Sequence, residues 1–219
     1  MSGVAGGEAR GVQLEPAYFE LARELRDDLT GRGLFEGERR PVVGIGGESG
    51  SGKTITALCL ALELARTDVP CTVLHQDDYF RLPPRQNHEA RRLDLDVVGP
   101  GEVDFDRLNE HVAAFREGRP VEDAPLVDYP RDLFHSRPLD LGAARVLLVE
   151  GTYVLAHVDV DLRVFMEGHY PDTHSRRRER NRDPDDPLIE RVLAIEHEII
   201  RAHAGAADIT IGIDFRIAP

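Results

Sequence analysis

The sequence predicts an α/β fold with a mostly parallel central sheet and helices on both faces. Along its 219 residues, short apolar runs rich in β-branched residues alternate with longer amphipathic patterns. The first such unit joins Pro41–Ile45 to Pro70–Leu74 through a helix-forming stretch, and this order implies a right-handed crossover between parallel strands. Arg145–Gly151 is apolar without alternation, as expected of a strand covered on both faces. This length suits one domain of this kind.

In the N-terminal half, residues 1–13 are small and Gly-rich, which predicts a flexible terminus before a single domain at 14–219. Leu14–Leu29 carries apolar residues at helical spacing and stops at Thr30 and Gly31, so it predicts an amphipathic helix. Thr54–Ala65 is rich in helix formers and predicts the crossover helix.

In the C-terminal half, residues 81–103 contain paired prolines and a Gly-Pro-Gly run and predict a long polar connection. Asp104–Arg116 predicts a helix with an acidic first turn, and the following short runs to Pro138 favour a hairpin-like excursion. The remaining expected elements are the strands Leu162–Met166 and Ala207–Ile211 and the helix Pro187–His203 between them.

The loop after the first expected strand matches the phosphate-binding pattern G-x-x-x-x-G-K-[ST] from Gly47 to Thr54. Its strand-loop-helix context predicts a P-loop NTPase fold in three layers, with backbone amides and a helix N-terminus facing a polyphosphate. We therefore expect bound ATP. The expected nucleotide-binding residues are Gly47, Ser49, Gly50, Ser51, Gly52, Lys53 and Thr54.

Lys53 is the only lysine among the 27 residues that are Lys or Arg. A chain that uses arginine elsewhere keeps a compact ammonium at the one place where a planar guanidinium would not fit. We expect Lys53 to reach the β- and γ-phosphates as part of the catalytic set, and Thr54 to bind Mg²⁺.

Three acids lie at or just after the carboxyl ends of expected strands, where open α/β sheets bind ligands. Asp77 is predicted to accept the proton of an attacking hydroxyl and to touch the Mg²⁺ shell, while Asp78 orients substrate or caps a turn. Glu150 ends the most apolar strand and is predicted to order Mg²⁺ or its water.

An arginine-rich segment at about 174–187 predicts a lid over the phosphates. Arg176 and Arg180 share one helical face and would offset charge on the transferred phosphoryl group, as catalytic residues. A solvated charged face is the alternative reading of the same residues.

Composition excludes several classes of partner. A net charge of -13 argues against a nucleic-acid surface, and no apolar run approaches a membrane span. Two cysteines and the absence of a secretory pattern favour buried thiols and a cytoplasmic protein. A homo-oligomer is compatible with this composition.

The chain resembles the uridine/cytidine kinase and phosphoribulokinase group of P-loop kinases. Five landmarks stand in the same order, between Val42 and Ile211. They are G-E-S-G-S-G-K-T, Q-D-D-Y-F, the stretch Pro125–Arg137, V-E-G at 149–151, and an S-R-R…R segment followed by A-D-I. The resemblance implies Asp77 as catalytic base, a magnesium environment of Thr54, Asp77 and Glu150, and lid positions at Arg176, Arg177 and Arg180.

The chain departs from that family in the substrate region, about 78–137. Val127 stands where uridine kinases carry a pyrimidine-contacting tyrosine, and Leu93–Pro100 is longer than the family's ribose-binding segment and lacks its histidine. The residues still expected to bind the hydroxyls of a substrate are Asp78, Tyr79, Asp96, Asp128, His135 and Arg137.

The sequence thus predicts an ATP-dependent kinase that transfers the γ-phosphoryl group to a hydroxyl of a nucleoside-like or sugar-like small molecule. One alternative is a kinase of a non-nucleoside alcohol, such as a pantothenate-like compound, a sugar or a secondary metabolite. A second is an ATP-driven regulatory NTPase. A Ras-type G protein is excluded, because its guanine-reading N-K-x-D motif needs a second lysine and the chain has only Lys53.

Overall fold

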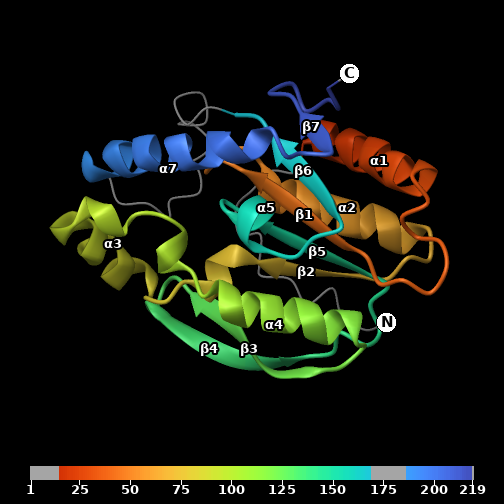
Figure 1. The fold of residues 1–219 in the computed structure, drawn as a ribbon, viewed down its shortest axis with the longest axis horizontal. Helices are drawn as coiled ribbons and strands as arrows, with labels where there is room; N and C mark the ends of the chain where they lie inside the picture. Colours follow the sequence, from red (N-terminus) through yellow and green to blue (C-terminus); the bar gives the residue numbers. More distant parts are fainter. Residues whose placement is uncertain (1–14, 169–185, 219) are drawn as a thin grey trace.

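The fold is built on a five-stranded parallel sheet in the order β2-β5-β1-β6-β7 (Figure 1). A computed structural model describes residues 15–168 and 186–218. The sheet strands are β1 (Val42–Gly47), β2 (Cys71–His75), β5 (Val146–Gly151), β6 (Leu162–Met166) and β7 (Ile209–Ile211). The α-helices are α1 (Pro16–Gly31), α2 (Lys53–Arg66), α3 (Pro84–Leu93), α4 (Phe105–Arg116), α5 (Val154–His157) and α7 (Leu188–Ala204).

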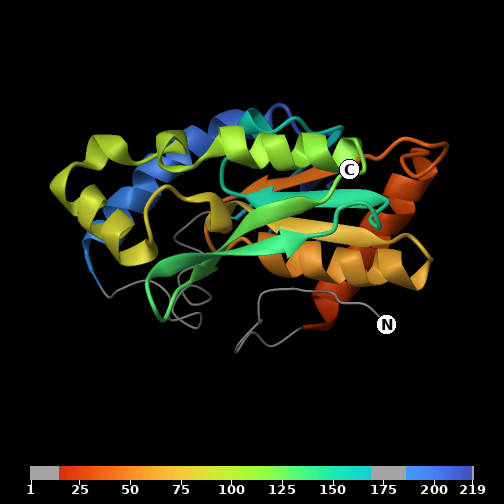
Figure 2. The same ribbon diagram turned by 90° about the horizontal axis from the view of Figure 1, so that it is seen from below.

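Helices cover both faces of the sheet, as Figure 2 shows edge-on. One core contains buried residues of α1 and α2 packed on β1, β5 and β6, with Leu25, Leu60 and Leu148 fully buried. The other contains residues of α4, α5 and α7, with Leu108 and Phe115 fully buried. Burial of such apolar surface on both faces is the main favourable term in folding. The predicted three-layer α/β fold is confirmed.

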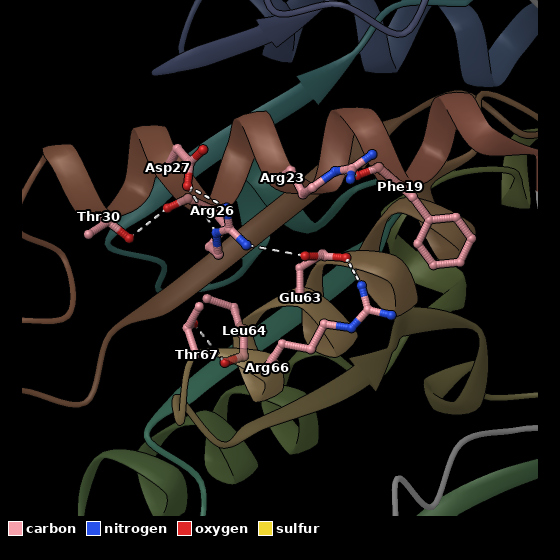
Figure 3. Close-up of polar contacts among 9 residues, drawn as sticks. All are labelled: Phe19, Arg23, Arg26, Asp27, Thr30, Glu63, Leu64, Arg66 and Thr67. Atoms are coloured by element: carbon pink, nitrogen blue, oxygen red, sulfur yellow. Dashed lines mark hydrogen bonds and ion pairs between the residues drawn. The ribbon is translucent and has the colours of Figure 1, made fainter.

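Helix α1 packs along α2 on one face of the sheet, and polar contacts border that apolar interface (Figure 3). Glu63 of α2 is buried and accepts hydrogen bonds from Arg26 of α1 at 3.2 Å and from Arg66 at 2.6 Å. Thr30 donates to the carbonyl oxygen of Arg26 at 2.7 Å near the end of α1. The helix expected over Leu14–Leu29 therefore serves to cover the crossover helix.

The parallel register brings the ends of neighbouring strands to one edge of the sheet. His75 at the end of β2 lies opposite Glu150 of β5, and Gly47 at the end of β1 lies opposite Met166 of β6. The Gly-rich loop begins at this edge, so it lies beside the ends of β2 and β5, where open α/β sheets bind ligands.

The excursion after α4 is an antiparallel hairpin of β3 (Val121–Asp128) and β4 (Leu133–Leu139), as the sequence suggested. The polar connection expected over residues 81–103 contains more order: the ten-residue α3 and two short 3₁₀ turns, η2 (Leu95–Val97) and η3 (Pro100–Glu102), follow the turn η1 (Gln76–Tyr79). Proline at the start of α3 fits a helix N-terminus, which explains why a Pro-Pro pair did not exclude a helix here.

In the described part of the chain, no helix combines the length and the apolar character needed to cross a membrane.

Candidate active site

The Gly-rich loop between β1 and α2 has a backbone that glycine adopts most readily. Gly47, Gly50 and Gly52 have φ angles of 144°, 81° and 99°. A Cβ atom on Gly47 would lie 2.5 Å from the carbonyl oxygen of Met166, so a larger residue would displace the loop from β6. The backbone of the loop can therefore approach an anion bound at the N-terminus of α2 closely.

The side chains of the loop are suited to phosphate. Lys53 is buried, and its Nζ donates to the carbonyl oxygen of Glu48 at 2.7 Å. The buried Oγ of Ser51 has no hydrogen-bond partner within residues 15–168 and 186–218. A polyphosphate supplies acceptors for an ammonium, a hydroxyl and backbone amides, so these residues fit the phosphates of a nucleotide.

Glu150 lies at the centre of a polar cluster beside the loop. Its Oε1 accepts a hydrogen bond from the Thr54 hydroxyl at 3.1 Å and is hydrogen-bonded to Nδ1 of His75 at 2.8 Å. Burial opposes ionisation of Glu150, but the hydrogen bond and charge of His75, with the charge of Lys53, outweigh it and lower the pKa of this carboxyl. The same pairing overcomes the effect of burial on His75 and raises its pKa.

This cluster fits a magnesium ion held jointly with phosphate oxygens. Among the described residues, no group of three or more His, Cys, Asp or Glu side chains could hold a metal by itself. Mg²⁺ in kinases is commonly bound by one or two protein ligands together with substrate phosphates. Thr54, in the first turn of α2, and Glu150, at the end of β5, supply the side-chain oxygen atoms for such a site.

The adjacent acids after β2 have different surroundings. Asp77 lines a cavity, and its Oδ2 accepts a hydrogen bond from the Tyr129 hydroxyl at 3.0 Å. Asp78 is buried, its Oδ1 accepts from the amide of Val127 at 2.9 Å, and burial raises its pKa to about 6. Asp77 thus faces the site, whereas Asp78 fastens the hairpin to the end of β2.

The cavity of about 180 Å³ lies between the Gly-rich loop, the hairpin, α3 and α7. Its lining combines a few polar side chains with apolar and aromatic ones, as is usual for small-molecule sites. The lining residues are Ser49, Asp77, Phe80, Leu82, Pro84, Asn87, Arg91, Val127, Tyr129, Phe134, Thr152, Ile189, Val192, Leu193 and Glu196.

The structure places the six predicted substrate residues outside the lining of this cavity. The buried Tyr79 hydroxyl contacts Nδ1 of His111 at 2.7 Å, and Asp96 is exposed on η2. Asp128 is hydrogen-bonded to the amide of Arg131 at 3.0 Å and to His135 at 3.3 Å, and these bonds, that of the amide first, lower its pKa. Of the other two predicted residues, Asp78 is the tie described above and Arg137 is half-buried on β4. Binding of substrate by these six stays a prediction.

Several cavity residues were missed by sequence reasoning. Asn87 and Arg91 belong to α3, which the sequence presented as a polar connection, and Glu196 lies on α7. His75 could have been found, because a parallel pairing of β2 with β5 places it opposite Glu150. The predicted lid residues Arg176 and Arg180 lie outside the described residues.

Comparison with known proteins agrees with this geometry. The pattern of the family described as "Phosphoribulokinase / Uridine kinase family" matches residues 42–170, which is more than half of the chain. The chain belongs to this family. It is a P-loop small-molecule kinase of the phosphoribulokinase/uridine kinase family, as the sequence landmarks indicated.

Individual relatives differ in acceptor. The bifunctional alpha-galactosidase/sucrose kinase AgaSK of Mediterraneibacter gnavus is 34% identical over 191 residues, which are 81% of this chain and 20% of the relative. This chain thus spans about a fifth of that protein. A uridine kinase of Yersinia pestis (strain Pestoides F) is 25% identical over 166 residues, covering 73% of this chain and 77% of the relative.

Solved structures share the fold at lower identity. A protein from Silicibacter sp. TM1040, described as a "putative fructose transport system kinase", has a TM-score of 0.62 and 23% identity, covering 88% of this chain and 95% of that one. Phosphoribulokinase from Rhodobacter spheroides has a TM-score of 0.59 and 13% identity, covering 80% of this chain and 71% of that one.

Proposed function

We propose that the protein is an ATP-dependent kinase that phosphorylates a hydroxyl group of a small sugar-like molecule. The observation that carries the proposal is the position of Asp77. Its carboxylate lines a cavity that also includes Ser49 of the phosphate-binding loop. A hydroxyl bound in that cavity would lie between a carboxylate that can accept its proton and the end of a nucleotide triphosphate.

Each residue has a defined task in this reaction. The loop amides and Lys53 bind the β- and γ-phosphates, and Asp77 accepts the proton of the attacking hydroxyl. The Tyr129 hydroxyl, donating to Oδ2 of Asp77, orients that carboxylate. Thr54 and Glu150 would hold Mg²⁺, which when bound offsets the negative charge of the phosphates.

Glu150 needs to be ionised for its task. His75 supports the ionised form, because the pairing lowers the pKa of Glu150 and raises that of His75. The predicted lid arginines Arg176 and Arg180 would add positive charge above the phosphates. In phosphoryl transfer the protein contributes chiefly such positioning and electrostatic stabilisation.

A sugar-like acceptor is favoured over a nucleoside by two observations. The relative with 34% identity is named as a sucrose kinase, and Val127, an aliphatic residue, lines the cavity where uridine kinases carry tyrosine. A nucleoside remains the second candidate, supported by the relative with 25% identity.

The test is a screen of hydroxylated compounds for ADP release with Mg-ATP. The panel contains D-fructose, D-glucose, sucrose, pantothenate, uridine and cytidine, and phosphorylated products are identified by ³¹P NMR. We expect one or more neutral sugars to stimulate ADP release and to yield a phosphate ester. Slow ATP hydrolysis that none of these compounds accelerates would overturn the proposal in favour of a regulatory NTPase.

A further inference from the structure

One wall of the cavity is made by α3 and α7, two helices far apart in the sequence. Figure 1 shows them extending together beyond the sheet edge at which the phosphate-binding loop begins. From this wall Asn87, Arg91 and Glu196 line the cavity. None of the three is explained by phosphate binding or by proton transfer.

Glu102, which is not part of the cavity lining, fixes the side chains of Arg91 and Asn87. Its buried carboxylate accepts from Nε of Arg91 at 2.5 Å, from Nη2 of Arg91 at 2.9 Å and from Nδ2 of Asn87 at 3.0 Å. The amide of Gly99 also donates to Glu102, at 2.8 Å. A bidentate arginine-carboxylate pair has a fixed geometry, so the Arg91 guanidinium is pre-oriented.

The wall therefore offers hydrogen-bonding atoms at fixed positions. No hydrogen bond within residues 15–168 and 186–218 uses Nη1 of Arg91 or Oδ1 of Asn87. Glu196 lies 3.2 Å from Nη2 of Arg91 and adds carboxylate oxygens. One donor and two kinds of acceptor side by side match the hydroxyls of a polyol, each of which both donates and accepts.

The charges at this wall disfavour an anionic ligand. Arg91 is paired with both Glu102 and Glu196. Among the described lining residues, Arg91 carries a positive charge, and the two carboxylates that contact it already offset that charge. A guanidinium whose charge is already offset in this way attracts a phosphate or carboxylate less than an unpaired one would, so the wall favours a neutral acceptor.

Aromatic residues complete the subsite. The Arg91 guanidinium lies 5.9 Å above the ring centroid of Phe80, and Tyr129 and Phe134 line the same cavity. Their rings and the aliphatic residues of α7 provide apolar surface for the carbon skeleton of a ligand whose hydroxyls face the polar wall.

We propose that Arg91, Asn87 and Glu196 form a subsite for two neighbouring hydroxyl groups of an uncharged polyol, and that this subsite selects neutral acceptors over phosphorylated or acidic ones. The inference rests on the proposed function, since the phosphorylated hydroxyl would be the one that lies at Asp77. It adds the residues that bind the rest of the acceptor and the charge of the acceptor.

The first test compares Glu196→Gln with Glu198→Gln, the same change two residues along α7 at an exposed side chain. For the best neutral acceptor of the screen, Glu196→Gln should raise KM roughly 10- to 100-fold, the range for a lost hydrogen bond to a charged group. KM for ATP and the thermal unfolding midpoint should stay near the wild-type values. The Glu198→Gln protein should match the wild type in all three.

The second test removes the hydroxyl from the ligand instead of the carboxylate from the protein. Deoxy derivatives of the acceptor are compared on wild type and Glu196→Gln. The derivative that lacks the contacted hydroxyl should bind weakly to both proteins, so the penalty of the substitution should vanish for that derivative alone. A role of Glu196 in folding only would reduce binding of every derivative equally, and that result would overturn the proposal.

Charge selection is tested with D-fructose 6-phosphate and D-glycerate as anionic probes beside D-fructose. Preference for either anion would overturn the inference even if the kinase reaction is real. If no probe is phosphorylated, calorimetric binding of neutral sugars that Glu196→Gln abolishes would retain the subsite while the proposed function fails. Normal transfer by Glu196→Gln would retain the function and remove the subsite.

Discussion

The phosphate end and the acceptor end of the cavity are assembled by different means. The phosphate end is one continuous loop, Gly47–Thr54, joined by strand ends that the parallel register brings together. The acceptor end takes side chains from the turn after β2, α3, the hairpin and α7. There, the ion pair Arg91–Glu196 connects α3 to α7, and Arg92–Asp186 connects α3 to the residues just before α7.

The difference explains where this family can vary. Changing the loop alters the backbone path between two core elements, because Gly47 has no space for a Cβ beside Met166. Changing a cavity-lining side chain of α3 or α7, such as Asn87 or Glu196, alters the surface that faces the ligand and leaves the backbone path of the loop as it is. This agrees with the names of two relatives, sucrose kinase and uridine kinase, which refer to different acceptors.

The largest effect on activity is expected for Asp77, which lies between the phosphate end and the acceptor end of the cavity. Asp77→Asn should lower kcat about 10²- to 10⁴-fold with KM for ATP nearly unchanged, because the amide cannot accept the hydroxyl proton. Single-turnover assays with radiolabelled ATP measure it. Asp68→Asn, in an exposed turn with φ of 58°, is the matched control and should retain wild-type activity. Undiminished transfer by Asp77→Asn would remove Asp77 from the mechanism.

A smaller loss of activity is expected when the side chain at position 53 keeps its positive charge but changes its shape. Lys53→Arg should lower kcat about 10²- to 10³-fold, because a planar guanidinium does not fit the buried position of Nζ. Steady-state kinetics with Mg-ATP check it. Arg66→Lys at the exposed end of the same helix is the control. Near-normal activity of Lys53→Arg would show that charge alone suffices at this end.

His197 tests whether α7 connects the two ends. Its Nδ1 lies 2.6 Å from Oε1 of Glu48, in the phosphate-binding loop, while the neighbouring Glu196 lines the acceptor cavity. His197→Phe should raise KM for ATP about 10-fold, since it removes a hydrogen bond to a buried carboxylate. His197→Asn keeps a donor and should restore part of the affinity. Equal KM values for ATP in the wild type and both variants would mean that α7 does not contribute to ATP binding.

The smallest effect is expected for the exposed contact between α3 and Asp186, which lies just before α7. Arg92 donates to Asp186 at 2.7 Å, and the Arg92 side chain is 54% exposed. Exposed ion pairs contribute about 0.2–1 kcal/mol, so Arg92→Gln should change the acceptor KM less than about 5-fold, and less at high salt. Kinetics at two salt concentrations measure it. A change as large as that of Glu196→Gln would mean that helix spacing, not the ligand contact, sets affinity.

Much of the phosphate end could be predicted from the sequence because its information is local. Spacing in the Gly-rich loop, the β-α-β order and the acid at the end of an apolar strand are all visible in short windows. The structure places Thr54 within hydrogen-bonding distance of Glu150, two residues that the sequence assigned to the same ion. Binding of that ion stays a prediction.

Less of the acceptor end could be predicted from the sequence. Tyr79, Asp128 and His135 look like ligands in the sequence, yet their contacts lie within the turn, the hairpin and α4. Arg91 and Glu196 are separated by more than 100 positions along the chain and meet at 3.2 Å. No window of sequence contains both.

The sequence by itself determined the α/β fold, the phosphate-binding loop and the acid that follows β2, because each depends on neighbours in the chain or on strand order. Only the tertiary structure decided which residues hold the two adjacent aspartates in place and which polar residues line the cavity. The physical reason is that a side chain's surroundings depend on how helices pack, and α3, the hairpin and α7 meet only once the sheet has brought them together.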